Sequence, residues 1–313
     1  MEFIIYSPGF NDKIGGVYAL HLLCHLLNKN GAKASMYPWF YHDEISAIHI
    51  KAPLSKAIAS RDLLNNYPAY ITNPRWNTPV YSGQVEEVSG RTDLIVVYPE
   101  VVFGNPLRAK NIARWLLNTP GAHNKKIYFT YGEVQFLYRE FFQPLKQMGL
   151  ETADFQLHVL EVPWDLFDVR NPNVSTEPRV GTAYALRKGK HKPIQHELEG
   201  SILIDNLSMQ EIGEVFKKVE TFISYDTASL YSQLAVLSGC NSVVIPDVGV
   251  TKEQWRARVE DTYGIAYGFQ EIGYALSTRH LLAQTLLEWE KASIRSVDTF
   301  IAYWEKRVIG SLS

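Results

Sequence analysis

The chain has 313 residues, a length that suits two domains of ordinary size. Its formal net charge is −2 and its pI is about 6.5, which argues against a protein that binds nucleic acid through bulk electrostatics. No apolar run in the sequence is long enough to form a transmembrane helix. We therefore expect a cytoplasmic protein, with the inner face of a membrane as an alternative place for it.

The first half of the chain alternates apolar strands with predicted helices. Residues 4–6 and 34–39 are predicted strands, and the apolar residues between them recur at helical spacing over 17–28. The run 93–98 is almost entirely apolar, as in a strand buried on both faces of a parallel sheet. The other elements predicted here are a helix that starts at 105–106 and continues through 112–116, a strand over 126–130, a helix over 134–148 and a strand over 158–160.

A second series of the same kind follows 163–178, a polar stretch with three prolines that we interpret as a linker. The predicted elements of this half are strands at 180–186, 202–204, 221–224 and 242–245 and helices over 208–219 and 227–238. The last helix carries one apolar stripe, formed by Val297, Phe300, Ile301, Trp304 and Val308. Strands that alternate with helices predict parallel sheets flanked by helices, and therefore an α/β fold with two Rossmann-like domains.

A basic loop directly follows the first strand of the second half. It contains Arg187, Lys188, Lys190 and Lys192 around the flexible Gly189. Open parallel sheets bind ligands at the carboxyl ends of their strands, and these side chains can neutralise a diphosphate there. The alternative is a solvated surface loop.

The next polar stretch, 224–233, follows another strand of this half. Asp226 is a suitable N-cap for the predicted helix, whose first amides would suit a phosphate. We expect Tyr225, Asp226, Thr227 and Ser229 at this site, and Gln233 lies four residues beyond Ser229 on the same helix face. The alternative is a capped core helix.

The order of these motifs resembles that of the GT-B glycosyltransferases. The segment Gln233–Pro246, with Ala235 and Gly239 before an apolar strand, is similar to their nucleotide-sugar region. Arg187-Lys188-Gly189 is similar to their basic loop, and Gly15-Gly16 before an apolar helix resembles their N-terminal glycine loop. The sequence departs from the family at Gln233, where a glutamate often binds the ribose, and this puts the identity of the nucleotide in doubt.

The resemblance implies a GT-B fold whose two domains face a cleft. It implies an acceptor-binding domain over 1–165, a nucleotide-sugar-binding domain over 166–291, and a C-terminal helix over 292–313 that packs on the first domain. It implies metal-independent transfer of a hexosyl or related glycosyl group in surface-polysaccharide synthesis, with no cofactor beyond the nucleotide-sugar donor. The acceptor would be a glycan or a lipid-linked sugar, and no nucleic acid would bind.

Within that resemblance, the acceptor site would include Gly15 and Gly16, and an inverting enzyme would need a carboxylate to take the proton of the acceptor. The candidate bases lie in loops after strands or before helices: Asp12, Asp43, Glu100 and Glu133. The aromatic segment 138–142 allows a peripheral membrane contact, although a core-facing helix explains it equally well. Two other functions stay open, namely a sugar-nucleotide epimerase of the same fold and a non-catalytic partner protein that retains the fold.

Overall fold

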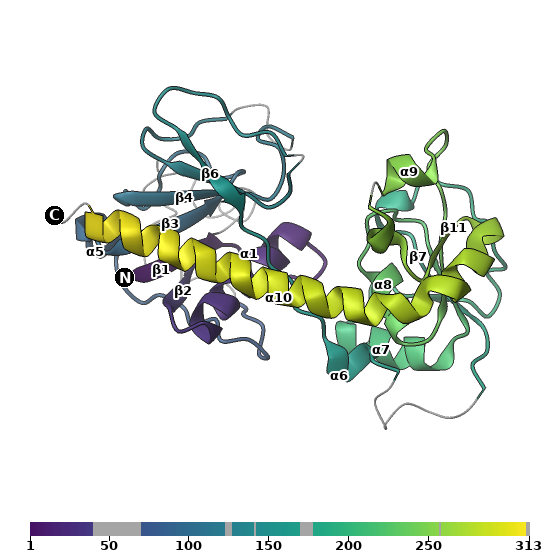
Figure 1. Cartoon of the computed structure of the whole chain (residues 1–313). Coiled ribbons are helices and arrows are strands. Elements are labelled where there is room, and N and C mark those ends of the chain that lie inside the picture. Colours follow the sequence, from purple (N-terminus) through teal and green to yellow (C-terminus); the bar gives the residue numbers. More distant parts are fainter. Residues whose placement is uncertain (40–69, 123–126, 141, 170–177, 257, 311–313) are drawn as a thin grey trace, which may run out of the picture. The chain divides into compact units, whose positions relative to one another are not determined.

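The computed structural model describes residues 1–39, 70–122, 127–140, 142–169, 178–256 and 258–310. The chain divides into two compact units (Figure 1), which we call unit 1 (Met1–Glu161 with Glu290–Ser313) and unit 2 (Val162–Trp289). The resemblance implied divisions after residues 165 and 291. Among the described residues, no helix combines the length and the apolar character that crossing a membrane requires.

Unit 1 is built on a parallel sheet that has six strands in its described part, in the order β2-β1-β3-β4-β5-β6. The strands are β1 (Glu2–Ser7), β2 (Lys33–Pro38), β3 (Leu94–Pro99), β4 (Asn111–Leu116), β5 (Val134–Leu137) and β6 (Glu151–Gln156). The helices are α1 (Gly15–Lys29) and α5 (Val85–Gly90). The strands over 4–6, 34–39 and 93–98 and the helix over 17–28 are therefore confirmed.

Two predicted helices of unit 1 are wrong. The segment expected to form a helix from Asn105 contains β4, and the segment expected to form a helix over 134–148 contains β5 followed by loops. The predicted strands over 126–130 and 158–160 are wrong as well, because their described residues are irregular and the last strand is β6. In the described residues, loops rather than helices connect β3 to β4, β4 to β5 and β5 to β6 (Figure 1).

Unit 2 is built on a second parallel sheet, in the order β11-β10-β9-β7-β8. Its strands are β7 (Thr182–Ala185), β8 (Ile202–Leu203), β9 (Thr221–Ser224), β10 (Asn241–Val244) and β11 (Ile265–Tyr267). Its helices are α6 (Trp164–Phe167), α7 (Met209–Lys218), α8 (Tyr231–Leu237) and α9 (Lys252–Trp255), with short 3-10 turns η1 (Arg187–Gly189), η2 (Val259–Thr262) and η3 (Phe269–Glu271). Ser208 and Glu211 form a capping box at the start of α7, as the Ser-x-x-Glu pattern favours.

The final helix, α10 (Ile272–Gly310), starts in unit 2 and ends in unit 1. Its apolar stripe enters the core of unit 1, where the ring centroid of Phe300 lies 5.4 Å from that of Phe3 and 4.8 Å from that of Phe136. The hydroxyls of Ser293 and Ser296 accept the backbone N–H groups of Leu160 and His158 at 2.8 and 2.9 Å. The expected fold class is therefore confirmed: two parallel α/β sheets and a C-terminal helix that returns to the first domain.

Both sheets share one strand order. Numbered within each unit, the order is 2-1-3-4-5, and unit 1 adds a sixth strand at the end. In this doubly wound order the chain reverses direction between the first and third strands, and ligands bind at the carboxyl ends of those two strands. This rule points to the ends of β1 and β3 in unit 1 and to the ends of β7 and β9 in unit 2.

Candidate functional site

The basic loop and the polar stretch of unit 2 meet at the carboxyl ends of β7 and β9. The turn η1 follows β7, and Tyr225 directly follows β9. Gly189 packs so closely on Tyr225 that an added Cβ would lie 2.0 Å from the Tyr225 carbonyl oxygen. Only glycine fits there, and the predicted basic loop is therefore seated at the point where the strand order reverses.

Arg187 has an unusual backbone conformation that its neighbour Asp205 stabilises. Its φ is 42°, in the left-handed region that non-glycine residues rarely occupy. The two carboxylate oxygens of Asp205 accept the N–H groups of Leu186 at 3.0 Å and of Arg187 at 2.9 Å. The guanidinium carbon of Arg187 lies 4.7 Å from the ring centroid of Tyr231, the first residue of α8. The cation is thus held beside the start of this helix.

Sequence reasoning missed Asp205. The signal was present, because Asp205 follows the apolar run 202–204 and parallel strands end at one edge of a sheet. Its function is nevertheless indirect, since its two carboxylate oxygens accept backbone amides of the loop that carries Arg187.

If the loop of Arg187 binds a nucleotide, as the sequence predicts, we expect Asp205→Asn to weaken that binding about tenfold, because the amide can accept only one of the two N–H groups and has no charge. Titration calorimetry with a nucleoside diphosphate measures this change. In an Arg187→Ala background the same substitution should change the affinity little, since the residue that it positions is gone. Equal losses in both backgrounds would show that Asp205 does not act through Arg187.

Lys192 is engaged in a different way from the other basic residues of the loop. Its side chain is buried, and its Nζ donates to Asp247 Oδ1 at 2.7 Å and to the Ile245 carbonyl at 2.8 Å. Lys192 and the Thr227 hydroxyl, which donates to Asp247 Oδ2 at 3.1 Å, hold the pKa of Asp247 below its usual range. Lys192 was expected to bind a nucleotide together with the other cations of the loop. Its Nζ instead joins the loop to the end of β10. Lys188 and Lys190 are exposed.

The helix after β9 starts later than predicted, at Tyr231 instead of Thr227. Asp226 is not its N-cap, because Asp226 Oδ1 accepts the Ala228 N–H at 3.0 Å within a turn. Ser229 Oγ likewise accepts the Tyr231 N–H at 3.2 Å. Short polar side chains that bind nearby amides compete with helix formation, and here they delay it. Asp226 and Ser229 therefore shape a turn, and Gln233 is a buried residue of α8.

Tyr225 has a structural function that the sequence did not indicate. Its ring is buried, and its hydroxyl accepts the Gln195 N–H at 2.8 Å and lies 2.8 Å from His196 Nδ1. Burial lowers the pKa of His196 and raises that of Tyr225. Because the hydroxyl already holds the loop 187–196, the expectation that Tyr225 contacts a nucleotide is corrected.

Gly15 and Gly16 form the start of α1, after β1 in unit 1. An added Cβ at Gly15 meets nothing within 4 Å, and one at Gly16 lies 3.7 Å from Leu117 Cδ1, an ordinary contact. Packing within the described part of the chain therefore does not demand glycine at either position, which leaves room for a ligand as an explanation. Asp12 is half-buried in the turn before α1, and Asp43 lies outside the described residues.

Glu100 directly follows β3, beside the point where the strand order of unit 1 reverses. Its carboxyl group is buried, and its Oε2 accepts the Leu117 N–H at 3.0 Å. Burial raises the pKa of Glu100 to about 7, although the hydrogen bonds from backbone amides oppose the shift. A carboxylate with such a pKa can take or give a proton near neutral pH.

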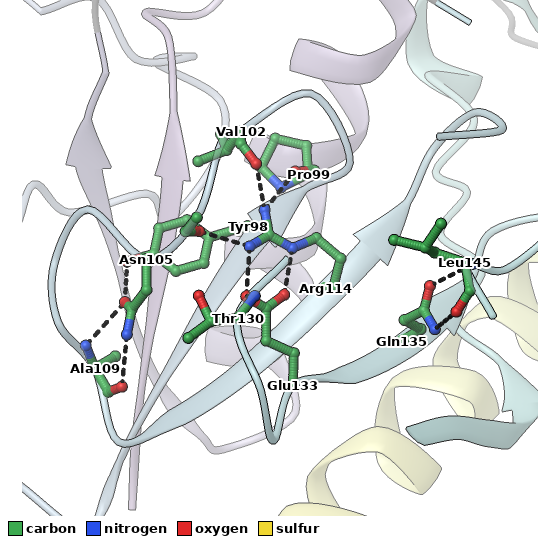
Figure 2. Close-up of polar contacts among 11 residues, drawn as sticks. Tyr98, Pro99, Val102, Asn105, Ala109, Arg114, Thr130, Glu133, Gln135 and Leu145 are labelled. Atoms are coloured by element: carbon green, nitrogen blue, oxygen red, sulfur yellow. Dashed lines mark hydrogen bonds and ion pairs between the residues drawn. The ribbon is translucent and has the colours of Figure 1, made fainter. Parts of the chain in front are cut away.

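Glu133 has a different environment, which corrects its assignment as a base. It is fully buried and forms two hydrogen bonds with Arg114, at 2.7 and 2.9 Å (Figure 2). The other N–H groups of Arg114 donate to the carbonyls of Pro99, Val102 and Gly104 at 2.7–3.2 Å. Every donor of Arg114 is thus satisfied, and its guanidinium also lies near the rings of Tyr98 and Phe129. Glu133 balances this charge and is closed to an acceptor.

The described residues contain no group of three or more His, Cys, Asp or Glu side chains arranged to hold a metal. His21 and His25, which share a face of α1, bind protein groups instead. His21 Nε2 lies 2.9 Å from the Pro8 carbonyl oxygen, and His25 Nδ1 accepts the Asn77 N–H at 3.0 Å.

Comparison with known proteins gives a similarity at the level of structure alone. No family model matches the sequence, and the search of curated proteins found no match. Two solved structures of phage T4 β-glucosyltransferase, one in complex with its UDP-glucose substrate, each align over 99% of both chains with a TM-score of 0.44 and 10% identity. Glycosyltransferase VinC in complex with dTDP aligns over 98% of this chain and 99% of its own, with a TM-score of 0.40 and 9% identity. Similarities at this level assign no function to the chain.

Proposed function

We propose that this protein is a glycosyltransferase that moves a sugar from a nucleotide-sugar donor to a glycan or lipid-linked acceptor. The observation that carries the proposal is the position of Arg187. It lies at the carboxyl end of β7, where doubly wound sheets bind ligands, and Asp205 holds it in a strained backbone conformation. Strain of this kind is kept where the surrounding structure fixes it, and often at a binding site.

In the proposed donor site, Arg187 binds the diphosphate through its forked N–H groups, and the exposed Lys188 and Lys190 add positive charge. These cations stabilise the charge that develops on the departing nucleoside diphosphate, without a metal ion. Thr227 lies in the adjoining turn and would contact the phosphates or the ribose, whereas the buried Ser229 supports that turn by accepting the Tyr231 N–H. Lys192 and Tyr225 keep this loop in position.

In the proposed acceptor site, Glu100 takes the proton of the acceptor hydroxyl. Its raised pKa, about 7, makes it a stronger base than an exposed carboxylate while leaving a large ionised fraction near neutral pH. Gly15 and Gly16 would border the sugar at the start of α1, since packing among the described residues requires neither of them.

The alternative of a sugar-nucleotide epimerase shares the donor site and differs in its products. The protein incubated with UDP-, GDP-, dTDP- and CMP-sugars should slowly release free nucleotide from one donor class, with water as the acceptor. Conversion of one sugar epimer into another would favour the epimerase. Absence of both binding and hydrolysis across the panel would favour the non-catalytic partner protein and overturn the proposal.

We expect Arg187→Ala to weaken nucleotide-sugar binding by roughly 10- to 100-fold, because it removes a charge-assisted hydrogen-bond donor from the diphosphate. Titration calorimetry measures the affinity, and circular dichroism checks that the fold is unchanged. Lys218→Ala is a matched control, because Lys218 is an exposed cation that also belongs to unit 2. It lies at the C-terminal end of α7, and β8 precedes the N-terminal end of that helix. An unchanged affinity for Arg187→Ala would show that the diphosphate binds elsewhere.

A further inference from the structure

Unit 1 exposes a group of large apolar side chains on the loops around β4, β5 and β6. Met148 is 89% exposed, Tyr131 77%, Phe103 63% and Tyr128 51%, and Ile127 is 36% exposed. Soluble proteins expose single apolar residues routinely, whereas a contiguous group commonly marks an interaction surface. We call Phe103, Ile127, Tyr128, Tyr131 and Met148 the aromatic patch.

Contacts between the loops bring the members of the aromatic patch together. The rings of Phe103 and Tyr128 stack with centroids 5.2 Å apart, and the Gly104 N–H donates to the Tyr128 carbonyl at 2.9 Å. The ring of Tyr131 lies across Gly149, where an added Cβ would come within 2.0 Å of it, and Gly149 is the neighbour of Met148.

The buried Arg114 fixes the loops beneath these side chains. Its Nη2 donates to the Gly104 carbonyl at 2.7 Å and to the Glu133 carboxylate at 2.9 Å, which joins the loop of Phe103 to the loop of Tyr131. The Gly132 N–H donates to the Gly149 carbonyl at 2.7 Å and adds the third loop. The aromatic patch therefore sits on a cross-linked support.

The segment that carries the aromatic patch is strongly basic. Residues 103–149 contain seven Arg or Lys and two Asp or Glu, a net charge of +5 in a chain whose net charge is −2. The pair Arg114–Glu133 cancels internally, so the excess comes from the remaining cations: Arg108, Lys110, Lys125, Lys126, Arg139 and Lys146. Arg108, Lys110 and Lys146 are exposed.

We propose that the aromatic patch docks this protein on an anionic lipid surface. Aliphatic and aromatic side chains at Met148, Ile127 and Phe103 can enter the interfacial region, and tyrosines favour the level of the headgroups. The cations of the same segment attract acidic headgroups. A nucleic acid would also attract the cations, but the most exposed member, Met148, offers no ring on which a base can stack.

The test measures sedimentation of the full chain with vesicles of phosphatidylcholine alone and of phosphatidylcholine mixed with phosphatidylglycerol. We expect binding to the anionic vesicles, weaker binding at high salt, and little binding to the neutral ones. Tyr131→Ser combined with Met148→Ser should weaken the binding by roughly tenfold or more, because both apolar groups are lost. Lys146→Glu should weaken it by roughly tenfold.

Matched controls lie on unit 2. Val180→Ser combined with Val259→Ser removes two exposed apolar side chains, and Lys218→Glu reverses one exposed charge. Both should bind vesicles like the unchanged protein. Three outcomes would overturn the proposal. They are absence of vesicle binding, equal loss of binding in the test and control variants, and binding to a single-stranded oligonucleotide in place of the vesicles. Release of nucleotide from a soluble donor is measured without lipid, so failure of the glycosyltransferase proposal is detected separately.

Discussion

Replacing Glu100 with glutamine is expected to lower kcat by roughly 10²- to 10⁴-fold, the usual contribution of a general base. Glutamine keeps the size of the side chain and can still accept the Leu117 N–H, but it cannot take a proton. The rate is measured as release of nucleotide from the donor that the binding panel identifies, while the affinity for that donor should change little. A glycosyltransferase whose base lies elsewhere would keep most of its activity in this variant.

The pH dependence follows from the pKa of Glu100, about 7. In the proposed reaction the ionised form is the base, so kcat/KM should rise with pH, reach half of its maximum near pH 7 and level off above it. Asp12→Asn is the control, since Asp12 is another described candidate base and is half-buried, whereas Glu100 is buried. If Asp12→Asn rather than Glu100→Gln removed the activity and the pH dependence, the base would be Asp12.

Stability gives a readout for Glu100 that does not involve activity. Burial raises the pKa of this acid from 4.5 in the unfolded chain to about 7 in the folded protein. The neutral form is therefore favoured in the fold, and the stability that it contributes is lost as the pH rises from about 4.5 to 7, by up to about 3 kcal/mol. Glu100→Gln should remove this part of the pH dependence. Urea unfolding of both proteins at several pH values measures it.

Breaking the buried ion pair of unit 1 should have the largest effect on stability. Arg114→Ala leaves Glu133 buried without its partner, and we expect a loss of about 3–5 kcal/mol in the free energy of unfolding. The substitution also leaves the carbonyls of Val102 and Gly104 without a donor. Replacing both charges, as in Arg114→Met with Glu133→Leu, should cost less, because neither charge is then left unpaired.

Arg307→Ala is a matched control for the ion pair. Arg307 is also paired with a glutamate of unit 1, Glu151, at 2.8 Å, but both side chains are largely exposed. We expect this substitution to cost no more than about 1 kcal/mol. Urea unfolding of the full chain compares the variants. A loss for Arg114→Ala that does not exceed the loss for Arg307→Ala would contradict the role assigned to the buried pair.

Local pattern was sufficient for most of the elements. The strands near residues 4–6, 93–98 and 221–224 are short apolar runs, and such runs identify buried strands regardless of their partners. Helix α7 has its capping box in sequence, and the stripe of α10 has an unbroken helical period. The candidate donor loop could also be located, because the carboxyl ends of parallel strands lie at one edge.

The predicted helices from 105 through 116 and over 134–148 were wrong for a physical reason. Ile112, Trp115 and Leu116 have the spacing of a helix face, yet they belong to β4, where both faces are buried and no alternation is visible. Arg114 lies in that strand only because Glu133, nineteen residues further along, and three loop carbonyls satisfy it. No local pattern contains such a partner.

The strands β1, β3 and β9, the helices α1, α7 and α10 and the basic loop after β7 were thus determined by the sequence itself, since each depends on neighbours in the chain. The tertiary structure decided which polar residues are available for chemistry. It enclosed Glu133 and Lys192 in ion pairs, delayed the start of α8, and placed Asp205 against the amide of Arg187. It also raised the pKa of Glu100 through burial, and burial is a property that packing alone confers.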